Sequence, residues 1–262
     1  MKIIKFKKTS KDKYKVYLDD NTTISLYEDV IINNNLLITK EIVNVEDLIK
    51  ENNDIHLYSV ALNYISIRIR SKKEIKEYLI KKGASLNKID EVINKLVKNG
   101  YINDFSFAKA YVSDQMILTP NGPYKIKRGL VKYGVNEDII NEVIDEIDKN
   151  ILKEKLSNLM EKQIRIKKGA SNMIRLKLIN YFTNLGYDKE MIIDVMSHYK
   201  VKTDFDKLEK EYKKLYDKYS KKYEENEINY RIKNKLYQKG YSFEEIEKVS
   251  INWYLLLCFS CS

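Results

Sequence analysis

Four glycines recur along this chain in the same local setting, and their spacing constrains the fold more than any other feature. They are Gly83, Gly134, Gly186 and Gly240, at intervals of 51, 52 and 54 residues. Apolar residues stand eight and four positions before each glycine, and isoleucine and valine stand six and nine positions after it. A fixed period of this length is the signature of a repeat protein. The core positions that it predicts are Ile75, Leu79, Ile89 and Val92; Ile126, Leu130, Ile140 and Val143; Leu178, Phe182, Ile192 and Val195; and Ile232, Leu236, Ile246 and Val249.

Each glycine is expected to end one helix shortly before the next begins. Glycine readily adopts the left-handed backbone conformation that closes a helix. Two residues later stands a short side chain whose oxygen can cap the following helix. The spacing of the apolar residues places them on one face of each helix. The expected capping residues are Ser85, Asn136, Asp188 and Ser242.

We therefore expect a mainly α fold, in which about four tandem three-helix repeats form a curved, elongated array. The repeats span 56–102, 103–150, 151–200 and 201–250. Ser250 replaces an apolar residue of the other repeats, so we expect the last helix to be cut short and 251–262 to form an apolar C-terminal tail. The expected helices span 56–67, 71–82 and 86–98; 104–117, 123–133 and 137–149; 151–165, 171–184 and 189–199; and 204–223, 226–239 and 243–250.

Residues 1–55 differ from the repeats, and we expect them to form a small β-rich N-terminal element. Three short segments are rich in β-branched and aromatic residues, and Asp19-Asp20-Asn21 supplies a turn between the last two. Glu28–Asn33 is expected to be a short helix, whereas 40–53 could be a strand or a helix. Asn52-Asn53-Asp54 is interpreted as the boundary with the repeats. The expected strands cover 3–6, 13–18 and 22–26.

The chain carries 48 Lys and Arg against 38 Asp and Glu, a net charge of +10. Such an excess is typical of a protein that meets nucleic acid or another anionic surface, although a codon bias toward Lys, Asn, Ile and Tyr could also produce it. No secretory signal follows Met1. The apolar run Trp253–Phe259 is far shorter than the about 20 residues of a membrane-spanning helix. We expect a cytoplasmic protein that does not bind membranes.

The sequence lacks the motifs of the common catalytic and cofactor sites. It contains no phosphate-binding loop, no dinucleotide-binding glycine motif and no signature of a zinc protease or serine hydrolase. His56 and His198 stand apart near helix ends. Cys258 and Cys261 lie in the tail, with no second pair to complete a zinc site. We expect no enzymatic activity, no metal and no cofactor.

Basic residues cluster on, or just before, the second helix of successive repeats. Lysine stands seven positions before the glycine in three repeats, as Lys76, Lys127 and Lys233. A solvated lysine-rich face would give this pattern, but its recurrence favours a continuous positive strip that contacts phosphates. Most of the 21 tyrosines lie beside apolar residues at helical spacing, which favours packing over base stacking. The candidate binding residues are Arg68, Arg70, Lys72, Lys73, Lys76, Lys125, Lys127, Arg128, Lys132, Arg165, Lys167, Lys168, Arg175 and Lys177.

Three segments resemble the RecX family of regulatory proteins. Arg70-Ser71, followed by Glu74 and by Leu79-Ile80-Lys81-Lys82-Gly83, is similar to the opening signature of the family. Residues 99–112, NGYINDFSFAKAYV, and 122–135, GPYKIKRGLVKYGV, resemble its second and third blocks. The resemblance is strongest over 65–145. In weaker form it covers the N-terminal element and the later repeats, as in the long form of Gram-positive bacteria, whereas 251–262 have no counterpart.

The resemblance implies a modulator of the RecA recombinase that takes part in DNA repair, recombination and the SOS response. Such a protein binds the RecA–DNA filament along its helical groove and limits strand exchange and co-protease activity. The resemblance implies no catalysis, no cofactor and only weak, salt-sensitive binding to single- or double-stranded DNA, and we expect a monomer. Two other functions stay open: a stand-alone DNA-binding module built on helix-turn-helix pairs, and a scaffold for another protein partner.

Overall fold

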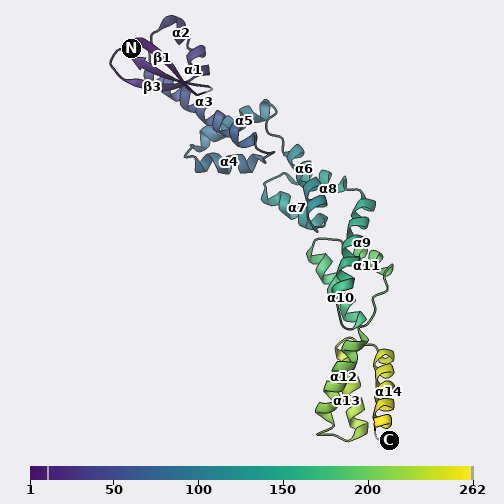
Figure 1. Ribbon diagram of the computed structural model, residues 1–262. Helices are drawn as coiled ribbons and strands as arrows, with labels where there is room; N and C mark the ends of the chain where they lie inside the picture. The colour runs from purple at the N-terminus through teal and green to yellow at the C-terminus, as the bar shows by residue number, and fades with distance from the viewer. Residues whose placement is uncertain (11, 261–262) are drawn as a thin grey trace. The chain divides into compact units, whose positions relative to one another are not determined.

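The computed structural model describes residues 1–10 and 12–260, and the side chains of 254–260 lie outside this description. Fourteen helices and three strands make up this part of the chain (Figure 1). It divides into two compact units, one formed by 1–111 with 129–143 and the other by 112–128 with the residues from 144 onward. The mainly α fold with a small N-terminal sheet, predicted from the sequence, is confirmed.

The N-terminal element is a three-stranded antiparallel sheet packed against helices. Strands β1 (Ile3–Ser10), β2 (Lys13–Leu18) and β3 (Thr23–Tyr27) pair in the order β1-β2-β3. Val16, Leu18 and Leu26 are buried from the sheet, and Val30 and Ile31 of helix α1 belong to the same core. A small sheet needs a packed hydrophobic face to be stable, and this core supplies it. The helices that follow are α1 (Glu28–Asn33), α2 (Leu36–Thr39) and α3 (Val45–Ile65).

Helix α3 joins the N-terminal element to the first repeat without interruption. Asn44 caps it by accepting hydrogen bonds from the backbone N–H groups of Glu46 and Asp47. The residues interpreted as a boundary, 52–54, lie inside this helix. The reason is tertiary: Asn52 accepts a 2.8 Å hydrogen bond from the Tyr27 N–H and donates one of 3.1 Å to the Ser25 carbonyl. Asn52 thus connects the helix to strand β3 and does not interrupt the chain.

Each of the four repeats contains three helices, most of which lie within a few residues of their predicted bounds; α3 begins earlier than predicted and α14 ends later. All sixteen predicted core positions are buried, with exposed fractions between 0% and 7%. The first repeat contains the end of α3 with α4 and α5, and in the fourth the helices α12, α13 and α14 pack side by side (Figure 1). The bounds are α4 (Lys72–Lys81), α5 (Leu86–Lys98), α6 (Asp104–Leu118), α7 (Pro123–Lys132), α8 (Glu137–Asp145), α9 (Lys149–Ile166), α10 (Ser171–Asn184), α11 (Lys189–Ser197), α12 (Phe205–Tyr219), α13 (Glu225–Gln238) and α14 (Phe243–Ser260).

The last helix extends beyond residue 250, where the sequence led us to expect its end. Helix α14 continues to Ser260, into the segment that we interpreted as a tail. Ser250 is 7% exposed, and its hydroxyl lies 3.2 Å from the hydroxyl of Tyr212. Because this hydrogen bond satisfies the polar group inside the core, serine can occupy an apolar position without ending the helix. Cys261, and the side chain of Cys258, lie outside the described part of the chain.

The four repeating glycines close their helices as predicted. Their φ angles are +84°, +73°, +89° and +88°, all in the left-handed region. At each one the glycine N–H bonds the carbonyl three residues back, and the next N–H bonds the carbonyl five residues back, which is the Schellman arrangement. The side chains of Asn136, Asp188 and Ser242 cap the helices that follow, whereas Ser85 makes no such bond.

Three of these glycines also lie against the second helix of the preceding repeat. A Cβ atom on Gly186 would stand 2.4 Å from the backbone nitrogen of Lys125, and one on Gly240 would stand 2.4 Å from Cγ of Met173. On Gly134 it would be 3.0 Å from Cδ of Lys73. Nothing lies within 4 Å of the same point on Gly83. All four glycines need left-handed backbone; at Gly186 a close backbone contact adds a second reason, whereas at Gly134 and Gly240 the neighbour is a flexible side chain.

In the first three repeats, the first turn of the second helix is closed by the repeat that follows. The Lys72 N–H donates to the Asp104 carboxylate at 2.9 Å, and the Ser171 N–H donates to the hydroxyl of Thr203 at 2.9 Å. At α7 the Tyr124 N–H donates to the Gly186 carbonyl at 3.0 Å. These bonds satisfy N–H groups that have no acceptor within their own helix.

We predict that Gly186→Ala destabilises the protein more than Gly83→Ala. Both substitutions place a Cβ in left-handed backbone, at a cost of about 1–2 kcal/mol. Only at Gly186 must the Lys125 backbone also move, which adds about 1–3 kcal/mol. Urea unfolding followed by circular dichroism measures both. Equal losses would contradict the second role of the glycine.

Candidate functional site: a basic helix face

Helix α7 carries the most one-sided positive charge of the repeat helices. It holds four cations and no carboxylate, whereas the next helix, α8, holds four carboxylates and no cation. The two charge types are therefore segregated onto successive helices of one repeat. A helix with this composition attracts anions along its free face and repels cationic surfaces.

The fold presents a row of these cations to solvent. Ile126 and Leu130 are fully buried, so the opposite face of α7 points outward. Lys125, Arg128 and Lys132 are exposed at spacings of three and four residues, which places them on one stripe of the helix. Within the described residues none of these three side chains makes an ion pair or a hydrogen bond. This stripe, Lys125-Arg128-Lys132, is hereafter the α7 row.

The cations before helix α4 are, in contrast, engaged inside the protein. Glu74 lies 2.6 Å from Nη2 of Arg68 and 3.4 Å from Nη1 of Arg70, and it accepts from the Ser71 N–H at 3.1 Å. With the Ser71 hydroxyl bonded in return to the Glu74 N–H, this is a capping box. One carboxylate thus partly neutralises two of the candidate cations.

Arg70 is part of the packing of the first repeat. Its side chain is only 13% exposed, and its guanidinium stacks over the ring of Tyr64 at 4.1 Å. Tyr64 in turn stacks on Tyr78, with ring centroids 3.9 Å apart and planes only 6° from parallel. The Nε of Arg70 is buried without a partner. A guanidinium held this way braces α3 against α4, and little of it is presented to an external anion.

Other candidates also have partners within the described chain. Lys76 lies 3.1 Å from Asp90 of α5, and Lys73 donates to the Lys132 carbonyl at 2.9 Å. Arg165 pairs with Glu161 at 2.6 Å. The lysines seven positions before the glycine, Lys76, Lys127 and Lys233, are all half-buried, and Lys127 also has an interaction partner. Lys167 lies over the ring of Tyr181 at 5.6 Å.

Seven candidates therefore keep their charge available to a ligand. Six of them are exposed and Arg175 is half-buried, and none makes an ion pair or side-chain hydrogen bond to a described residue. Lys132 and Lys73 both line a pocket of about 270 Å³ beside α4, together with Lys81 and three tyrosine rings. The seven are Lys72, Lys125, Arg128, Lys132, Lys168, Arg175 and Lys177.

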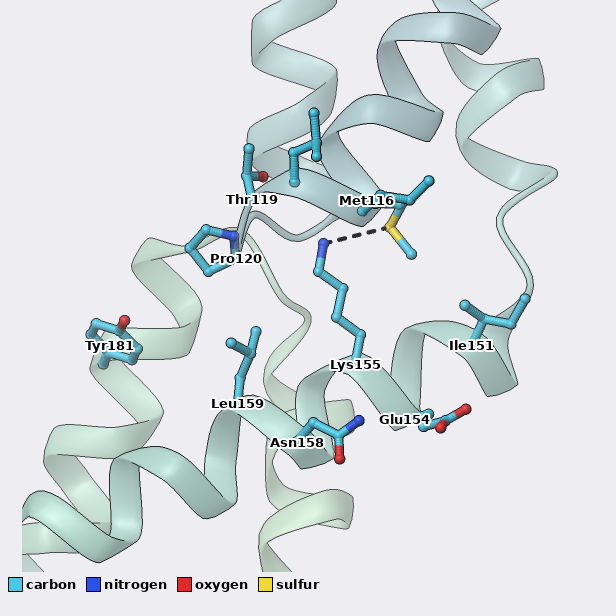
Figure 2. A pocket seen from close by; sticks show the side chains of 11 residues that line it. Met116, Thr119, Pro120, Ile151, Glu154, Lys155, Asn158, Leu159 and Tyr181 are labelled. Atoms are coloured by element: carbon cyan, nitrogen blue, oxygen red, sulfur yellow. Dashed lines mark hydrogen bonds between the residues drawn. The ribbon is translucent and has the colours of Figure 1, made fainter.

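A larger pocket, of about 670 Å³, lies between the end of α6 and helices α9 and α10. Figure 2 shows Lys155 rising from α9 into it, toward Met116. Its ammonium group donates to the carbonyls of Gln115 and Asn121, each at 3.1 Å, and burial lowers its pKa. Lys155 thus anchors the loop before α7. Sequence reasoning missed it, because a lone lysine in a charged helix gives no signal of its own.

The described residues contain no group of three or more histidines, cysteines or carboxylates placed to hold a metal ion. No helix among them is both long enough and apolar enough to span a bilayer. The Nδ1 atom of His56 lies 2.7 Å from the Tyr27 hydroxyl, within the protein. Burial, and then the nearby positive charge of Lys13, lower the pKa of His56. His198 stands at the C-terminal cap of α11.

The fold and its charged helices define a class, namely a helical repeat protein with basic second helices. Residues 58–96 match the family model described as RecX, first three-helix domain. The chain is 30% identical over 251 residues to the regulatory protein RecX of Listeria welshimeri, which covers 93% of each chain. It is 31% identical over 258 residues to that of Bacillus cytotoxicus, covering 93% of this chain and 94% of the other. The chain belongs to the RecX family of regulatory proteins.

Solved structures share the fold. The crystal structure of RecX from Lactobacillus salivarius superposes with a TM-score of 0.53 at 28% identity, covering 55% of this chain and 96% of that chain. A second crystal structure, of a regulatory protein RecX, gives a TM-score of 0.65 at 21% identity and covers 75% of this chain and 99% of that chain. The three-helix repeat is thus a property of the family as well as of this sequence.

We predict that Arg70 and Arg128, two arginines of the candidate set, respond differently to alanine. Arg70→Ala removes the stack on Tyr64 and the contact with Glu74, and should lower the free energy of unfolding by about 1–3 kcal/mol. Arg128→Ala, on an exposed face, should change it by less than about 0.5 kcal/mol. Thermal or urea unfolding measures both. Similar values would mean that the stack carries no stability.

Proposed function

We propose that this protein is a negative modulator of the RecA recombinase, which binds the RecA–DNA filament along its groove and limits strand exchange and co-protease activity. Membership of the RecX family over 93% of the chain supports regulation of RecA in general. The single observation that carries the proposed mode of binding is the α7 row, whose three cations have no partner inside the described protein. We place this activity in the cytoplasm and assign it to a monomer.

The physical basis of the proposed binding is electrostatic. A filament groove exposes phosphates and protein carboxylates, and each phosphate neutralised by a lysine or arginine releases condensed counterions. The seven available cations supply such contacts from three successive repeats. No bond is made or broken in this function. The inhibition follows from occupancy, because a protein seated in the groove blocks the approach of a second DNA.

We predict that the triple variant K125A/R128A/K132A binds RecA filaments on single-stranded DNA more weakly and with less dependence on salt. Three lost phosphate contacts should reduce the slope of log affinity against log salt by up to about 2. Co-sedimentation at several salt concentrations measures this slope. The matched control, K153A/R231A/K239A, removes the same charge from side chains already paired with Asp194, Glu227 and Glu211. Equal losses in the two variants would assign the effect to net charge alone.

The function itself is tested with RecA and single-stranded DNA. Wild-type protein at sub-stoichiometric levels should suppress RecA-dependent ATP hydrolysis and strand exchange, because one bound molecule spans several subunits. No effect at equimolar protein would refute the proposal. Sequence-dependent affinity for duplex DNA, surviving competition with random DNA, would instead indicate a stand-alone DNA-binding module.

A further inference from the structure

Three repeats expose a large aliphatic side chain at the same structural position. Ile67, Leu118 and Ile166 are 75%, 77% and 69% exposed. Each lies at the junction between the first and second helices of its repeat. Each stands four positions before a reference residue, which is the residue immediately before the second helix. Those reference residues are Ser71, Gly122 and Ala170. The fourth repeat has Ser220 at this position.

The repeat fold does not itself use these side chains. The sixteen core positions and the glycine contacts are satisfied without them, and each keeps more than two thirds of its surface in water. A junction of this kind can be polar, as Ser220 shows. A single exposed aliphatic side chain is ordinary on a protein surface, whereas three at the same position of successive repeats form a pattern. Their recurrence with the repeat therefore points to a partner.

The surroundings favour a protein over a nucleic acid. Leu118 lines the 670 Å³ pocket beside Ile117 and Ile151, which are also largely exposed. The lysine in that pocket, Lys155, already donates to two carbonyls. A phosphate would find apolar surface there and no available ammonium group. An apolar hollow on a protein surface would instead remove these side chains from water, which is favourable.

The cations beside the junctions indicate which groups should surround such a hollow on the partner. Ile67 is followed by Arg68, which pairs with Glu74 but keeps 48% of its side chain exposed, and Ile166 lies two residues before the exposed Lys168, one of the seven available cations. A carboxylate-lined rim on the partner would complement these cations. The expected binding site on the partner is therefore an apolar hollow edged by carboxylates, and the partner presents more than one such hollow.

We propose that Ile67, Leu118 and Ile166 are apolar anchors that dock into equivalent hollows on successive protein subunits of the filament. This inference rests on the proposed function and deepens it, because it assigns the protein-facing contacts separately from the phosphate-facing α7 row. A partner that repeats can engage several anchors of one molecule. The later contacts then form within an existing complex, and the overall affinity exceeds that of one anchor.

The test compares two triple serine variants in co-sedimentation with RecA filaments on single-stranded DNA. I67S/L118S/I166S removes the anchors. I38S/V43S/I193S is the matched control, since its residues are 82%, 102% and 49% exposed but lie away from the junctions. All six sites are exposed, so both variants should fold, which circular dichroism checks. We expect filament affinity to fall about tenfold for each anchor removed, whereas the control and the affinity for free DNA stay unchanged.

The outcomes separate the two proposals. If wild-type protein binds the filament and the anchor variant binds equally well, the anchors are refuted and the proposed function stands. If wild-type protein does not bind the filament, the proposed function fails and the anchors fail with it. Single variants test the repeating geometry: a loss confined to Leu118→Ser would refute it. An equal loss for the anchor variant and the control would assign the effect to general hydrophobicity.

Discussion

The structure depends on how the first turn of each second helix is closed. N–H groups at a helix start have no acceptor within the helix, and here the acceptor comes from the next repeat: Asp104 for Lys72, and Thr203 for Ser171. At α7 the acceptor is the carbonyl of Gly186, so the chain there must approach without a Cβ. At α7 one local requirement thus fixes both the contact between repeats and the identity of Gly186.

Much of the fold could be predicted from the sequence, because helix ends, caps and core positions are local signals that recur. The errors came from tertiary contacts. Asn52 looks like part of a boundary in the sequence, yet it lies within α3, where strand β3 offers it a donor and an acceptor. Ser250 looks like a helix end until Tyr212 bonds it. The second role of Gly186 was also hidden, since it requires knowing which residue of another repeat lies opposite.

The candidate site was harder to predict, because charge alone does not tell whether a cation is free. Arg70 and Lys76 fit the basic pattern in sequence, yet Glu74, Tyr64 and Asp90 engage them in the fold. The α7 row stands out only after such pairs are removed. The sequence identifies which helices carry basic residues. The structure then separates the basic side chains that brace a repeat from those that remain available to bind.

The closure of a second helix by the following repeat affects the order in which the repeats can fold during synthesis. A chain leaves the ribosome from its N-terminus, so α4 can be completed only after Asp104 has emerged, and α10 only after Thr203. A repeat closed in this way can therefore finish folding only after part of the next repeat has been synthesised. Among the described residues no later repeat closes α13, and Glu224, which precedes α13, makes no side-chain cap of its own. We therefore expect the repeats to assemble from the N-terminal end of the chain, and unfolding to begin at the uncapped start of α13.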